Sequence, residues 1–194
     1  MPNICRNSVE ITGDTKDITK FLNTITKKDN NGEYYYSFTE ASPMPKELQN
    51  LHQGMRTIDG VRCNVWYEDD DGARPMLDIT KDEMIDKYGT YEPVSWQYDY
   101  WGTKWGDMST ELVSDEIVDG KRTVHFWFES AWGQPFILLH DICTKFNLTM
   151  INKYDIEFEE ELKTDTYPIE NAEEMINEYR NSMRDMRSSV RDVV

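Results

Sequence analysis

The chain contains two kinds of short periodic run, some with an apolar residue at every second position and some with apolar residues three or four apart. The first kind predicts strands and the second predicts helices. Cys5, Val9 and Ile11 show the strand spacing, whereas Phe136 and Leu139 show the helical spacing. In chain order, the predicted elements are strand 3–11, helix 14–28, strand 34–38, strand 110–118, strand 123–130, helix 135–146, strand 149–158 and helix 169–190.

Residues 46–95 interrupt this order and are interpreted as an insertion after the second strand. Further along, Asp119-Gly120 lies between two strand-like runs and predicts a two-residue hairpin turn. Without the insertion, the order contains the split βαβ plan of a ferredoxin-like domain, an antiparallel sheet with helices on one face. We therefore expect an α+β fold with one ferredoxin-like domain at 1–162. A C-terminal helix within 166–194 would pack on that domain or on a partner.

Aromatic residues are concentrated in the middle of the chain, and five of the six tryptophans lie between residues 96 and 132. Rings in such a stretch can stack on bases or enclose an amine, with a lysine supplying charge. Aromatic side chains near glycines more often pack together, so we interpret residues 98–105 and 126–132 as two halves of a packing motif. The candidates for an aromatic binding site are Tyr98, Tyr100, Trp101, Lys104 and Trp105.

The charge of the chain restricts its partners. A formal net charge of -16 over 194 residues would repel nucleic-acid phosphates and anionic membranes, so direct nucleic-acid binding is disfavoured. A protein with a basic surface is the better expectation. No stretch of about 18 apolar residues is present, and residues 1–6 lack the layout of a signal peptide, which predicts a cytoplasmic protein without membrane association.

Residue types that carry chemistry are sparse. Three widely spaced cysteines predict neither a disulfide framework nor a zinc site. Asp69 and Asp71 fit two positions of a calcium loop, but the first ligand and the final glutamate are missing, because Tyr67 and Asp78 stand there. No nucleophile or phosphate-loop motif occurs, and the three histidines are scattered. We expect no cofactor, no metal and no catalytic residues.

The acidic residues near the end of the last predicted strand are the main candidates for partner binding. Alternating carboxylates on a strand lie about 6.7 Å apart, roughly twice the spacing of charges along one DNA strand. Such a row can imitate phosphates toward a nucleic-acid-binding protein. It can equally be a solvated strand face that prevents edge aggregation. The candidate residues are Asp155, Glu157, Glu159, Glu160 and Glu161, joined by Asp69, Asp70 and Asp71.

Four motifs occur together in a familiar order: Pro2-Asn3-Ile4-Cys5-Arg6-Asn7, Pro43-Met44-Pro45, Trp101-Gly102-Thr103-Lys104-Trp105 and Phe126-Trp127-Phe128-Glu129-Ser130-Ala131-Trp132. With this set the chain resembles the YubB-like family of phage and conjugative-plasmid proteins, which have a ferredoxin-like domain. Ile4 and Glu129-Ser130 depart from the family's usual residues. The resemblance implies an origin in a mobile element, and so the cytoplasm of a host, and it supplies no catalytic residues.

These observations predict a small, acidic, non-enzymatic phage-type protein that binds a host or phage protein through a negative surface. A nucleic-acid mimic acting on a defence or nucleic-acid-handling system would fit. Nucleic-acid or nucleotide binding through the aromatic stretch and the sheet face stays open, and so does a virion or structural accessory role. An enzyme would require a pocket that gathers carboxylates and a histidine. The methionine-rich C-terminal helix offers a surface for a homo-oligomer.

Overall fold

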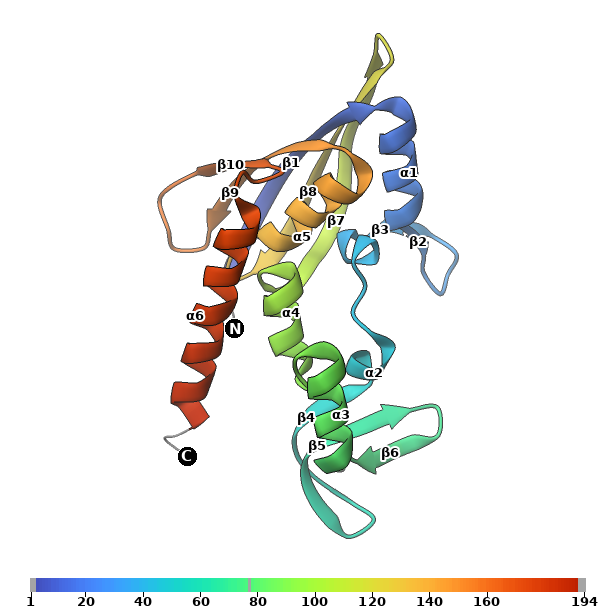
Figure 1. The fold of residues 1–194 in the computed structure, drawn as a ribbon. Coiled ribbons are helices and arrows are strands. Elements are labelled where there is room, and N and C mark those ends of the chain that lie inside the picture. The colour runs from blue at the N-terminus through green and yellow to red at the C-terminus, as the bar shows by residue number, and fades with distance from the viewer. Residues whose placement is uncertain (1–2, 77, 192–194) are drawn as a thin grey trace. The chain divides into compact units, whose positions relative to one another are not determined.

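The computed structural model describes residues 3–76 and 78–191 (Figure 1). The protein is α+β, and its chain forms two compact units. The first unit combines Met1–Pro43 with Tyr98–Val194, and the second is Met44–Gln97. Among the described residues, no helix has both the length and the apolar character needed to cross a membrane.

The first unit is built on an antiparallel sheet with the strand order β10-β9-β1-β8-β7. The central strand β1 pairs with β8 on one side and β9 on the other. The turn Asp119-Gly120 joins β7 to β8 with both residues at positive φ, as the sequence predicts. The strands are β1 (Ile4–Asp14), β7 (Lys104–Val118), β8 (Lys121–Ala131), β9 (Thr149–Ile156) and β10 (Lys163–Tyr167).

One face of this sheet forms the core. The alternation predicted for β1 is confirmed, since Cys5, Val9 and Ile11 are all fully buried. Helices α1 (Thr15–Ile25) and α5 (Phe136–Phe146) pack on that face, and the rings of Phe21 and Phe146 meet edge to face at 5.6 Å. Each buried aromatic or aliphatic side chain stabilises the fold by roughly 1.5–3 kcal/mol.

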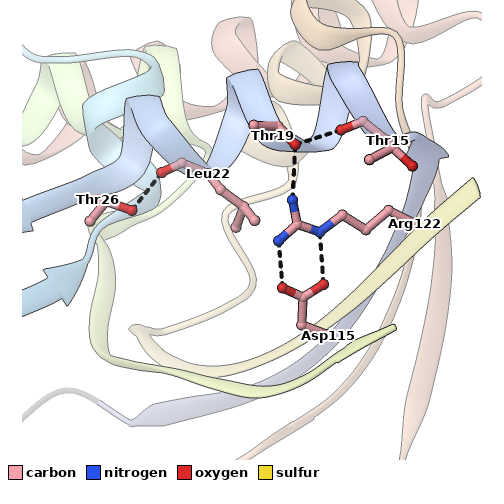
Figure 2. A network of polar contacts seen from close by, with 6 residues as sticks. All are labelled: Thr15, Thr19, Leu22, Thr26, Asp115 and Arg122. Carbon is pink, nitrogen blue, oxygen red and sulfur yellow. Dashed lines mark hydrogen bonds and ion pairs between the residues drawn. The ribbon is translucent and has the colours of Figure 1, made fainter. Parts of the chain in front are cut away.

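The hairpin of β7 and β8 extends past the rest of the sheet (Figure 1), and it is linked to α1 by Arg122 and by the Thr15 hydroxyl, which donates to the Gly120 carbonyl at 2.9 Å. Arg122 donates Nε to Asp115 Oδ1 at 2.7 Å and Nη2 to Oδ2 at 2.5 Å. Its Nη1 donates to Thr19 Oγ1 at 2.9 Å, and that hydroxyl donates to the Thr15 carbonyl (Figure 2). Two strands and a helix are thereby linked through a single guanidinium group.

The run 34–38 does not join the main sheet as the sequence suggested. Strand β3 (Tyr34–Tyr36) pairs only with β2 (Thr26–Lys28), in a separate two-stranded sheet. Phe38 belongs instead to the 3-10 helix η1 (Phe38–Ala41), where its ring packs against Phe126 and Phe128. In the main sheet the neighbour of β8 on the side away from β1 is the long strand β7.

The C-terminal region differs from the prediction in two ways. β9 ends at Ile156 rather than at residue 158, because Phe158 adopts a left-handed φ of 70° and the chain turns back. The returning segment forms β10, which takes up the start of the range 166–194, and the helix begins at Ala172 rather than at residue 169.

Helix α6 (Ala172–Arg191) packs on its own unit through Ile176 and Tyr179, next to Phe136 and Ile137. The Tyr179 hydroxyl donates to the Gly102 carbonyl at 2.9 Å. Helix α6 therefore packs against α5 and is hydrogen-bonded to the segment that leads into β7. Residues 192–194 of the range 166–194 lie outside the described residues, and a homo-oligomer through this helix stays a prediction.

The second unit contains a three-stranded antiparallel sheet in the order β4-β5-β6. Leu48, Val65 and Met84 are buried in it, and the Tyr67 hydroxyl contacts the Met84 sulfur at 3.3 Å. The insertion expected at about 46–95 falls within this unit. Its elements are α2 (Lys46–Gln49), β4 (Leu51–Ile58), β5 (Val61–Asp69), β6 (Gly72–Pro75) and α3 (Asp78–Tyr88), and α4 (Pro93–Trp101) follows and ends in the first unit.

Candidate interaction surfaces

Three large aromatic residues lie at one end of the five-stranded sheet. Lys104 pairs with Ala131, which puts Trp105 and Trp132 at the same end of β7 and β8. The backbone N–H of Trp132 donates to the Asn3 carbonyl, and the backbone N–H of Glu157 donates to the Ile4 carbonyl. The residues that follow β9 therefore lie at the same end of the sheet as Trp105 and Trp132. We call Trp105, Trp132 and Phe158 the aromatic rim; their exposed fractions are 40%, 51% and 87%.

The backbone of all three rim residues is strained. Their φ angles are 63°, 71° and 70°, in the left-handed region that bulky L-residues avoid. Each such residue costs roughly 1–2 kcal/mol relative to an ordinary conformation. Glycine would remove that cost, and a polar side chain would suit the solvent better. Because Phe158 gains little burial and Trp132 leaves about half of its surface in solvent, packing alone does not explain the choice of these residues.

The acidic segment at the end of β9 borders this rim, but it does not form the regular row expected from the sequence. Asp155 is bound by Arg6 at 2.7 Å, and Glu159 by Lys163 at 2.6 Å. Glu157 Oε2 accepts the backbone N–H of Ile4 at 3.2 Å, although the strand has already ended at Ile156. The spacing of about 6.7 Å therefore does not apply beyond that point.

The segment nevertheless keeps an excess of negative charge. Two of its carboxylates are paired, while Glu160 and Glu161 are exposed two and three residues after the exposed Phe158. Residues 155–161 carry five carboxylates, and two of these form ion pairs with Arg6 and Lys163. Three negative charges therefore remain uncompensated. Carboxylates and aromatic rings are thus adjacent in sequence and at one end of the sheet.

The second acidic group lies in the other unit. Its first residue, Asp69, is the last residue of β5, and Asp70 and Asp71 form the turn that leads to β6. Asp69 accepts the backbone N–H of Asp71 at 3.1 Å and pairs with Arg74 at 2.6 Å. These contacts are those of a closed polar turn, and a joint surface with residues 155–161 stays a prediction.

The aromatic stretch divides into packed and exposed members. Trp101 is 6% exposed, and its Nε1 donates to the Ser42 carbonyl at 2.9 Å. Tyr98 is half-buried and Tyr100 is exposed. Lys104 places its ammonium 4.5 Å from the centre of the exposed Trp105 ring. The stretch therefore does not present its rings on one surface.

The glycines on either side of Trp105 explain part of the local geometry. A Cβ on Gly106 would lie 2.4 Å from Thr39 Cγ2 and 3.2 Å from the Trp101 ring. Gly102 has a φ of 80°, and a Cβ on it would lie 2.7 Å from the Phe136 ring. Both positions need the absence of a side chain so that Trp101 and Phe136 can pack against the backbone.

The face of the sheet opposite the core stays accessible to solvent and carries half-buried His125 and Trp127. Ser8 Oγ lies 2.7 Å from His125 Nε2, beside Glu10 and Lys153, in a hollow of about 160 Å³. The hollow combines a histidine with a carboxylate, as an enzyme site would.

This Ser–His pair lacks the surroundings of a nucleophilic site. Ser8 lies in the central strand, between Trp127 of β8 and Lys153 of β9. The backbone N–H groups of a strand with neighbours on both sides are used by the sheet, so they cannot form an oxyanion hole next to the hydroxyl. We interpret the pair as a cross-strand hydrogen bond, and the absence of enzymatic activity stays a prediction.

The structure also shows a buried polar network that sequence reasoning missed. Asn7 and Asn152 occupy core positions of β1 and β9 and are fully buried. Asn152 Nδ2 donates to Asn7 Oδ1 at 3.0 Å and to Gln134 Oε1 at 2.8 Å. The Tyr167 hydroxyl donates to the same Gln134 oxygen at 2.7 Å. The sequence did contain a signal for this network. Asn7 and Asn152 each stand at a position of their strand where the alternation calls for an apolar core residue.

The network ends at Asp165, which accepts Gln134 Nε2. Burial raises the pKa of Tyr154 to about 12, and the charge of Asp165 and its hydrogen bond contribute to the shift. Burial likewise raises the pKa of Tyr167, again with a contribution from Asp165. Both phenols therefore stay protonated donors at neutral pH.

Among residues 3–76 and 78–191, no three His, Cys, Asp or Glu side chains gather as they would around a metal ion. Cys5 and Cys143 are buried thiols and Cys63 is half-buried, each unpaired with another cysteine. Comparison with known proteins found no matching family model and no match among curated proteins or solved structures. The resemblance to the YubB-like family therefore stays a prediction.

Proposed function

We propose that the first unit is a ferredoxin-like domain that binds a basic protein partner at the end of its sheet. The order β9-β1-β8-β7, with α1 after β1 and α5 between β8 and β9, supports the ferredoxin-like plan. In this assignment β10 and α6 are additions at the C-terminal side, and residues 44–97 are an insertion between η1 and β7.

The aromatic rim beside the acidic segment is the observation that carries the proposal. Exposed tryptophan and phenylalanine rings supply apolar contact area, and aromatic residues are common in the energetically important parts of interfaces. The neighbouring Glu160 and Glu161 attract cations, and a tryptophan face binds lysine or arginine side chains. An apolar segment with basic side chains has the matching chemistry. The net charge of -16 would steer such a partner toward the protein and repel nucleic acid.

A non-enzymatic role fits this surface, and the partner class follows from the charge. Proteins that handle nucleic acid carry basic surfaces, so a host or phage component of a defence or nucleic-acid-handling system suits the site. A carboxylate surface that competes with nucleic acid for such a partner would act as a mimic, with the aromatic rim adding affinity that charge alone does not give.

The test begins by capturing a partner from host cells and identifying it, and then measures the Kd of the purified pair. We expect Trp132→Ala with Phe158→Ala to weaken binding at least tenfold, about 1.4 kcal/mol. Glu160→Gln with Glu161→Gln should weaken it several-fold and reduce its dependence on salt. The control for the ring variants is Tyr34→Ala, which removes an exposed ring elsewhere. The control for the acidic pair is Glu173→Gln with Glu174→Gln. Unchanged Kd values for the rim variants would refute the proposal.

Nucleic-acid binding is the second candidate, and the accessible sheet face with His125 and Trp127 is what favours it. The same face carries Glu10 and Glu129 beside them, and its Arg6 is already bound to Asp155. Titration of tryptophan fluorescence with short single-stranded oligonucleotides at low salt separates the two candidates. We expect no change in fluorescence, whereas a saturable change that Trp127→Phe abolishes would establish the second candidate.

A further inference from the structure

A pocket of about 370 Å³ opens where β10, the start of α6 and the turn before α5 meet in the first unit. This volume lies within the range of ligand pockets, roughly 300–1,000 Å³. The pocket is distinct from the aromatic rim and from the hollow on the opposite sheet face. Its lining residues are Gln134, Phe136, Asp165, Thr166, Tyr167, Ile169, Met175 and Tyr179.

One side of this pocket is apolar and aromatic. The Phe136 and Tyr179 rings meet edge to face with centroids 5.0 Å apart. Ile169 and Met175 complete the wall, and Met175 is 38% exposed. Methionine adapts its shape to a bound molecule, and aromatic rings favour flat or cationic ligands.

The other side is polar, and four of its N–H and O–H groups already donate within the protein. Gln134 Nε2 donates to Asp165, and the Tyr167 hydroxyl donates to Gln134 Oε1 at 2.7 Å. The Tyr179 hydroxyl donates to the Gly102 carbonyl at 2.9 Å, and the backbone N–H of Ile169 donates to His140 Nδ1 at 3.1 Å. A ligand that needs donors would find these four occupied and would have the second N–H of Gln134 and the Thr166 hydroxyl left.

Acceptor capacity, in contrast, remains. The two oxygens of an ionised carboxylate accept about four hydrogen bonds, so Asp165 retains capacity beyond its contacts with Gln134 and Tyr154. Asn152 Oδ1, which has no hydrogen-bond partner among the described residues, is fully buried behind Gln134 and does not line the pocket. Glu173 and Glu174 in the first turn of α6 line a separate hollow, so Asp165 is the carboxylate that lines this pocket. The pocket is therefore complementary to a donor with positive charge.

We propose that this pocket binds an organic cation, an ammonium or guanidinium group on an apolar stem. The charged group would hydrogen-bond to Asp165, and the stem would lie between Phe136, Tyr179 and Met175. Such a group belongs either to a free small amine or to a lysine or arginine side chain of a peptide. The two sources present the same chemistry to the site.

The experiment uses the full chain with ¹³C-labelled methionine methyl groups and follows the Met175 signal, assigned with Met175→Leu, during titration by NMR. The probes are phenethylamine and its neutral analogue 2-phenylethanol. We expect a saturable shift of Met175 with the amine and at least tenfold weaker binding of the alcohol. Equal binding of the two would overturn the proposal, and this comparison needs no variant that has to fold.

A second arm tests the role of Asp165. Asp165→Asn keeps an oxygen that accepts Gln134 Nε2 but removes the charge, so the amine should bind at least tenfold more weakly while the alcohol is unaffected. Glu116→Gln, an exposed acid on β7, is the matched control and should change nothing. Full amine affinity in Asp165→Asn would overturn the proposal. A capped Gly-Arg-Gly peptide that binds more tightly than phenethylamine would identify a side chain as the source of the cation.

Discussion

Asp107 on β7 accepts the backbone N–H of Phe38 through Oδ2 at 3.0 Å, across 69 residues of sequence. Its Oδ1 accepts the N–H of Thr39 at 3.0 Å, and Thr110 Oγ1 donates to Oδ2 at 2.8 Å. One carboxylate thus satisfies the first N–H groups of η1, for which the preceding Ser37 provides no side-chain cap. The contact fixes Phe38 in the core against β8.

Replacing Asp107 with asparagine should destabilise the protein by about 1–3 kcal/mol, because one oxygen becomes an amide that faces an N–H donor instead of accepting it. Burial raises the pKa of Asp107, so the folded state binds its proton more tightly than the unfolded state does. Ionising this carboxyl therefore costs more in the folded state, and the cost in stability grows as the pH rises from the unfolded pKa through the folded one. Urea unfolding at neutral pH checks the prediction, with Glu111→Gln as the neighbouring control. An unchanged midpoint would contradict it.

Trp101 and Trp132 should respond very differently to truncation. Trp101→Ala removes a ring that is 6% exposed and leaves the Ser42 carbonyl without its donor, so we expect a loss of about 3–5 kcal/mol. Trp132 is 51% exposed, and its alanine variant should lose less than about 1 kcal/mol. Thermal and urea unfolding of the two variants give the comparison. Equal losses would mean that the rim ring is part of the core.

Much of the main sheet was predictable because its residues follow simple periods. The burial of Cys5, Val9 and Ile11 and the hairpin at Asp119-Gly120 were both expected from the sequence. β10 was missed because its residues are mostly polar, and only Tyr167 is buried at this edge of the sheet. A five-residue strand with a single buried apolar side chain shows no hydrophobic period that the sequence could reveal.

The candidate sites were less predictable, since they depend on turns and on contacts between distant segments. The alternation of Ile156 and Phe158 predicted a continuing strand, yet the left-handed backbone of Phe158 reverses the chain and exposes its ring. Trp132 was expected to pack and instead lies exposed at the rim. The pocket at Asp165 is assembled from three separate segments, none of which carries a motif.

The bidentate pair of Arg122 and Asp115 makes a prediction about acid stability (Figure 2). The hydrogen bonds from Arg122 lower the pKa of Asp115 below its usual range. A depressed carboxyl pKa stabilises the fold above the unfolded pKa, near 3.9, and that stabilisation is lost as the pH falls through the folded value. Because the pair is partly exposed, Asp115→Asn should cost about 1 kcal/mol or less at pH 7.

The free energies of unfolding of the wild type and of Asp115→Asn should converge as the pH falls below the folded pKa of Asp115. A protonated Asp115 no longer attracts Arg122 as an anion. Urea unfolding from pH 7 down to pH 2.5 measures this, with Glu116→Gln, the adjacent exposed acid, as the control. A constant difference between Asp115→Asn and the wild type over that range would show that the contact is not electrostatic.

The three cysteines should react with thiol reagents at very different rates in the folded protein. Burial raises the pKa of Cys5 to about 11 and that of Cys143 to about 12. At pH 8 a thiol with a pKa near 11 is ionised to about one part in a thousand, and the thiolate is the reactive form. Both sulfur atoms are also shielded by the core, whereas Cys63 is half-buried on β5. We expect one fast-reacting thiol under native conditions and three in urea, and Cys63→Ser should abolish the fast reaction. A fast reaction that persists in Cys63→Ser would show that the face of the sheet holding Cys5, or α5, opens to solvent.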